Sequence, residues 1–74
     1  MPKYCIENFE NAVGEKMKVY WEQTKHIHNA AFITTIKQKL GKNFGGNWEV
    51  NVNSYQSNQP RPSNPKAIDY GDLE

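Results

Sequence analysis

The sequence predicts an α+β fold in which two amphipathic helices pack on a short β-strand, with a disordered tail behind them. Apolar residues recur at helical spacing in two segments before residue 41, and they alternate strictly with polar residues from 48 to 53. After residue 55 the chain is rich in Pro, Asn and Ser. Because 74 residues make at most one domain, we predict a small α+β domain over residues 1–55 and a disordered tail over 56–74.

The first helix is expected between about residues 4 and 24. Its apolar positions follow one another at steps of three or four, the spacing that lines one face of a helix. These positions are Ile6, Phe9, Val13, Met17 and Tyr20. Gly14 falls in the middle of the segment, where glycine costs about 1 kcal/mol relative to alanine, so a bend is expected there.

The second helix is expected to begin after Asn29, whose side-chain oxygen can accept a hydrogen bond from an otherwise unpaired helix N–H. Its apolar stripe consists of Ala30, Ile33, Ile36 and Leu40. Glycine ends helices readily. The helix is therefore expected to stop at Gly41 or at the pair Gly45-Gly46, of which the pair is preferred.

Residues 48–53 are predicted to form a half-buried strand, because Trp48, Val50 and Val52 alternate with polar residues. A lone strand cannot satisfy its own backbone hydrogen bonds. This strand is therefore expected to pair with a second copy of the chain or with the edge of another protein. The side chains expected to meet that partner are Trp48, Val50, Val52 and Tyr55.

Residues 56–74 are expected to be extended and mobile. Pro60, Pro62 and Pro65 interrupt a stretch of Ser, Asn and Gln. Such a segment has too little apolar surface to offset the entropy lost on ordering.

The residues that could carry chemistry are few, and they lack companions. His26 and His28 are two positions apart, and no cysteine or acid beside them completes a metal site. Cys5 is the only cysteine, and no orienting group for a nucleophile is evident in the sequence. We therefore predict a protein that is not an enzyme and uses no metal, no cofactor and no small-molecule substrate.

The N-terminal segment has acidic residues between its apolar ones, which is not the pattern of a signal peptide. No apolar stretch is long enough to cross a bilayer. Together with the single thiol, these features favour a reducing compartment. A cytoplasmic location without a membrane partner is the expectation.

An alternative function follows from the distribution of charge. Residues 25–44 contain four lysines and no acidic residue. Lys37, Lys39 and Lys42 precede Phe44, and basic residues interleaved with aromatic ones are typical of surfaces that bind single-stranded nucleic acid. The alternative is a small nucleic-acid-binding regulatory protein, with a viral origin left open, although the pI of about 7.9 is below the value above 9 typical of such domains.

Residues 36–52 read Ile-Lys-Gln-Lys-Leu-Gly-Lys-Asn-Phe-Gly-Gly-Asn-Trp-Glu-Val-Asn-Val. This segment resembles the helix-to-strand passage of the LC8-type dynein light chains. Gly41 stands where that family usually has an acid, and Glu49 where it usually has His. The family continues with strands that form a swapped dimer and a peptide groove, whereas this chain continues with proline-rich sequence. The resemblance implies an adaptor-like role and the local order helix, turn and strand, and it transfers no groove residue.

The function expected from the sequence is thus a non-enzymatic protein–protein interaction module, adaptor-like or inhibitor-like. An exposed strand edge would supply main-chain hydrogen bonds, and aromatic side chains would anchor the contact. The partner would be another protein or a second copy of the chain.

Overall fold

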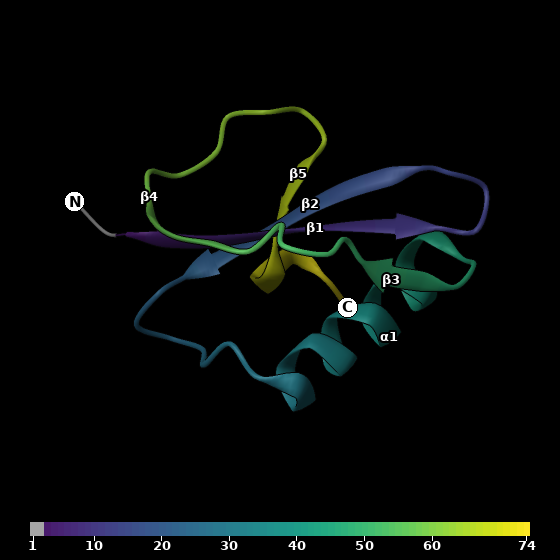
Figure 1. Ribbon diagram of the computed structural model, residues 1–74, viewed down its shortest axis with the longest axis horizontal. Coiled ribbons are helices and arrows are strands. Elements are labelled where there is room, and N and C mark those ends of the chain that lie inside the picture. Colours follow the sequence, from purple (N-terminus) through teal and green to yellow (C-terminus); the bar gives the residue numbers. More distant parts are fainter. Residues whose placement is uncertain (1–2) are drawn as a thin grey trace.

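The structure is a computed structural model that describes residues 3–74 as a mixed five-stranded sheet with one long helix (Figure 1). Its elements are β1 (Tyr4–Asn11), β2 (Lys16–Glu22), α1 (Ala30–Phe44), β3 (Trp48–Val50), β4 (Gln56–Gln59), β5 (Ala67–Asp69) and a 3₁₀ turn, η1 (Tyr70–Asp72). The sequence-based fold, two helices on one short strand, is therefore wrong.

Strand β1 is the centre of the sheet. Along one edge it pairs antiparallel with β2 over nearly its whole length. Its other edge is shared by β3, beside Phe9–Asn11, and β4, beside Tyr4 and Ile6. The outer edge of β2 pairs in parallel with β5, from Lys18 to Tyr20. In the strand order β3-β1-β2-β5, the first and last strands of the chain, β1 and β5, therefore lie on either side of β2.

The expected first helix is in fact the hairpin of β1 and β2. Both faces of β1 are buried, Cys5 and Phe9 on one side and Ile6 on the other. A strand buried on two faces shows no clean alternation, so its apolar residues fell by coincidence on a helical spacing. Gly14 lies in the turn with a φ of 87°, a conformation that glycine adopts without a steric penalty.

The second expected helix is confirmed as α1. The side chain of Asn29 accepts a hydrogen bond from Phe32 N–H at 2.8 Å, as an N-cap should. At the other end Gly45, with φ 75°, donates its N–H to the Gly41 carbonyl at 2.8 Å. The helix therefore ends at the Gly45-Gly46 pair.

The expected strand over residues 48–53 is shorter, and it is not alone. Strand β3 covers Trp48–Val50 and pairs with β1, and Asn53 has a φ of 61°. Because β1 occupies one edge of β3, the backbone of this strand no longer requires a partner from another molecule. Its outer edge carries no strand in the described part of the chain.

The expected disordered tail is also wrong, since residues 56–74 contribute β4, β5 and η1. Figure 1 shows the segment between β4 and β5 arching over the face of the sheet opposite α1. There Arg61 Nε donates to Tyr20 Oη at 3.4 Å. Strand β5 then leads to η1 on the helix side, where Leu73 is only 5% exposed.

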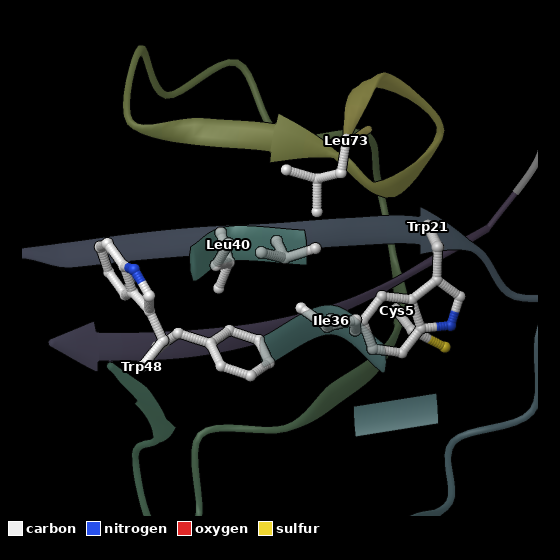
Figure 2. Packing of buried hydrophobic residues seen from close by; sticks show 8 residues of the cluster. Cys5, Trp21, Ile36, Leu40, Trp48 and Leu73 are labelled. Atoms are coloured by element: carbon white, nitrogen blue, oxygen red, sulfur yellow. The ribbon is translucent and has the colours of Figure 1, made fainter. Parts of the chain in front are cut away.

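The main core lies between α1 and the sheet. Its buried members are Cys5, Phe9, Val19, Trp21, Ile36, Leu40, Trp48 and Leu73. In Figure 2 the two tryptophans stand at opposite ends of this cluster, with Ile36 and Leu40 of α1 between them. A smaller cluster on the opposite face contains Tyr4, Ile6 and Tyr20. The sheet is therefore covered on both faces.

Candidate functional site

A hollow lies at the hairpin end of the sheet. At this end the β1–β2 turn, β3 and the end of α1 come together (Figure 1). The volume of the hollow is about 610 Å³, within the usual range for binding sites. It is lined by Gly14, Glu15, Lys16, Met17, Phe44, Trp48 and Lys66. We call it the hairpin groove.

The apolar lining of the hairpin groove comes from three elements. Met17 of β2 packs against the main core, and Trp48 of β3 belongs to it. Trp48 Nε1 donates to the Gly45 carbonyl at 2.9 Å, so this indole is fixed to the end of α1. Phe44, the last residue of α1, is 49% exposed. The groove thus has a rigid aromatic wall and one accessible aromatic side chain.

The polar lining carries more positive than negative charge. Lys16 and Lys66 take part in none of the ion pairs formed among residues 3–74. The carboxylate of Glu15 accepts a hydrogen bond of 2.7 Å from the side-chain amide of Asn11. The same Asn11 side chain holds the hairpin turn by accepting from Val13 N–H and Glu15 N–H. Two lysines are therefore free to meet a negatively charged ligand.

The structure separates the four predicted partner-binding residues. Trp48 is buried and Val50 half-buried, and both pack in or against the main core. Val52 is 85% exposed and lies beyond the end of β3. Tyr55 stacks on His28 with ring centroids 3.7 Å apart. Of the four, only Trp48 lines the hairpin groove.

The predicted nucleic-acid residues are also dispersed around α1. Lys37 Nζ lies 3.6 Å from Glu49 Oε1. Lys39 Nζ lies 4.7 Å from the centroid of the Tyr70 ring. Lys42 is exposed in the last helical turn, and Phe44 alone reaches the hairpin groove. The three lysines do not form one continuous basic surface.

The sequence reasoning missed Lys16, Met17 and Lys66. Met17 was assigned to a helix stripe, and Lys66 lies in the segment expected to be disordered. One signal could have found the hairpin: the turn formers Asn11 and Gly14 separate two runs rich in aromatic and β-branched residues. No local signal places Lys66 beside Lys16, because that proximity depends on the pairing of β5 with β2.

A second group of polar side chains lies at the other end of the core. Glu7 is 5% exposed, and its Oε1 lies 2.9 Å from His28 Nε2, a hydrogen bond in which the ring N–H donates. The Tyr55 hydroxyl is 3.3 Å from Cys5 Sγ. Because Cys5 is 2% exposed, its thiol is shielded from solvent, and this cluster holds the two loops that carry His28 and Tyr55 against the sheet.

The contact with Cys5 has a measurable consequence for Tyr55. The hydrogen bond with Cys5, burial, and the nearby charges of Cys5 and Glu7 raise the pKa of Tyr55 to about 12. Since folding favours the neutral phenol, its contribution to stability is complete below about pH 10 and is lost as the pH rises through 12. We expect one of the four tyrosines to ionise late in an ultraviolet titration. Tyr55→Phe should remove that late step, and a late step that persists in this variant would contradict the assignment.

Two further observations concern membranes and metals. Among the residues that the structure describes, no helix has the length and apolar character needed to cross a bilayer. Within the same residues, no three His, Cys, Asp or Glu side chains lie close enough together to hold a metal ion.

Comparisons of the chain with protein-family models, with curated proteins and with solved structures give no match. The order helix, turn and strand over residues 30–50 is present. Such an order occurs in many folds, so the relationship to the LC8-type light chains stays a prediction.

Proposed function

We propose that the chain is a non-enzymatic protein-interaction module that takes an apolar side chain of another protein into the hairpin groove. The observation that supports it best is Phe44, a large aromatic residue left 49% exposed at the mouth of a hollow that Met17 and Trp48 line. Aromatic residues and methionine are enriched where proteins bind one another. An apolar side chain from a partner would cover Phe44 and gain hydrophobic free energy.

The proposal differs from the edge addition expected from the sequence. Trp48 retains the role of an anchor, but as a fixed wall of the groove, because its side chain is buried in the core. Val52 and Tyr55 lie outside the groove lining. The contact would therefore depend on burying a side chain of the partner in the hairpin groove, and not on hydrogen bonds to the backbone of β3 alone.

The experiment is a selection from a displayed random peptide library on the folded chain, carried out in parallel on a Phe44→Asp variant. Because Phe44 is half exposed at the end of the helix, the variant is expected to keep its fold, which circular dichroism checks. We expect peptides with a shared apolar residue to be enriched on the natural chain and to bind the variant at least tenfold more weakly.

A matched control is Val52→Asp, which introduces the same charge at an exposed residue outside the groove lining. This variant should select the same peptides as the natural chain. Equal enrichment on the Phe44→Asp variant, or none on any chain, would contradict the proposed function. Sedimentation should show a monomer, and a dimer dispersed by Phe44→Asp would instead make a second copy the occupant.

A further inference from the structure

We infer that the partner segment is an extended peptide that carries acidic residues beside its apolar anchor. The inference rests on the proposed function and specifies the partner of the same groove. It is carried by two features that the apolar lining alone does not explain: two lysines without ion pairs, and an open stretch of the edge of β2.

The first feature is the charge of the groove. Lys16 and Lys66 come from β2 and from the residue just before β5, and both line the hollow. Glu10 is opposite Lys16 in the strand register, but the two charged groups are not within ion-pair distance in the structure. With Glu15 held by Asn11, the groove favours carboxylates on either side of an apolar residue.

The second feature is the outer edge of β2. Lys18 N–H donates outward to the Lys66 carbonyl at 3.2 Å. Main-chain groups of alternate residues in an antiparallel strand point to the same edge, so those of Lys16 point outward as well. Because β5 pairs only from Lys18 onward, the edge at Lys16 is left open where the groove begins. An extended segment can form main-chain hydrogen bonds there.

A peptide fits this surface better than a nucleic acid does. Bases bind single-strand sites by stacking on exposed aromatic faces. Trp48 is 5% exposed, and only Phe44 offers an accessible ring in the groove. One half-exposed ring beside two lysines is a small stacking surface, whereas it is enough for a single apolar side chain.

The test uses three synthetic peptides with leucine at the centre, flanked by aspartate, by asparagine or by lysine. Binding is followed by NMR on the labelled chain through the indole N–H signals of its two tryptophans. Trp48 lines the groove and Trp21 stands at the far end of the core. We expect the aspartate peptide to shift the Trp48 signal and to leave the Trp21 signal in place.

The decisive variant carries Lys16→Gln and Lys66→Gln. Its control carries Lys25→Gln and Lys37→Gln, which alters the net charge equally but removes lysines that lie outside the groove lining. We expect the decisive variant to bind the aspartate peptide about tenfold more weakly, the effect of losing two exposed ion pairs. The control variant should bind within about twofold of the natural chain.

The remaining outcomes distinguish the acidic partner from the proposed function. If the asparagine peptide binds as tightly as the aspartate peptide, the acidic partner is wrong and the proposed function stands. The same holds if no synthetic peptide shifts Trp48 while library peptides still depend on Phe44. If no synthetic peptide shifts the Trp48 signal and no library peptide depends on Phe44, both the inference and the proposed function are wrong. Tight, salt-sensitive binding of oligothymidylate at Trp48 would assign the groove to nucleic acid and overturn the inference.

Discussion

Replacing Leu73 with alanine is expected to lower the free energy of unfolding by about 2–4 kcal/mol, although it is the next-to-last residue. Its side chain is 5% exposed and belongs to the main core with Val19 and Trp21. Removing it leaves a cavity in that core. In a domain of this size, each kcal/mol corresponds to about 4–8 °C in the melting temperature, so thermal unfolding provides the measurement.

The control for Leu73→Ala is Val52→Ala, which shortens an aliphatic side chain that is 85% exposed. Its effect should remain within about 0.5 kcal/mol. If both variants have the melting temperature of the natural chain, the side chain of Leu73 does not contribute to the core. That result would contradict the packing of the C-terminal segment described above.

Replacing His28 with alanine is expected to destabilise the fold by about 2 kcal/mol, because it leaves the Glu7 carboxylate buried without its hydrogen-bond partner. The value is below that for a fully buried pair, since the His28 side chain is 32% exposed. Loss of the stacking on Tyr55 adds to the effect. Urea denaturation gives the free energy of unfolding.

A double-mutant cycle separates the two contributions. In a Glu7→Gln background the buried side chain is neutral, so His28→Ala should cost about 1 kcal/mol less than in the natural chain. Stacking on Tyr55 is present in both backgrounds and cancels. If His28→Ala costs the same in both, the negative charge of Glu7 adds nothing to the pair, and the histidine acts through packing and an uncharged hydrogen bond.

The candidate site was accessible to sequence reasoning only in part. Trp48 and Phe44 were singled out as anchors for two rival functions, and they line the same groove. Their proximity follows from local geometry, because the two residues are only four positions apart, on either side of a glycine turn. Met17 and Lys66 come from segments distant along the chain, and no pattern near either residue indicates the other.

The sequence by itself determined α1, from the Asn29 cap to the Gly45-Gly46 stop, and the short strand in which Trp48 and Val50 share one face. These features depend on hydrogen bonds and side-chain spacing within a few residues. The tertiary structure alone decided that β1 is paired along both of its edges and that residues 56–74 belong to the fold. Strand β1 pairs with three other strands and is buried on both faces, so its stability comes mostly from contacts with segments distant in the sequence.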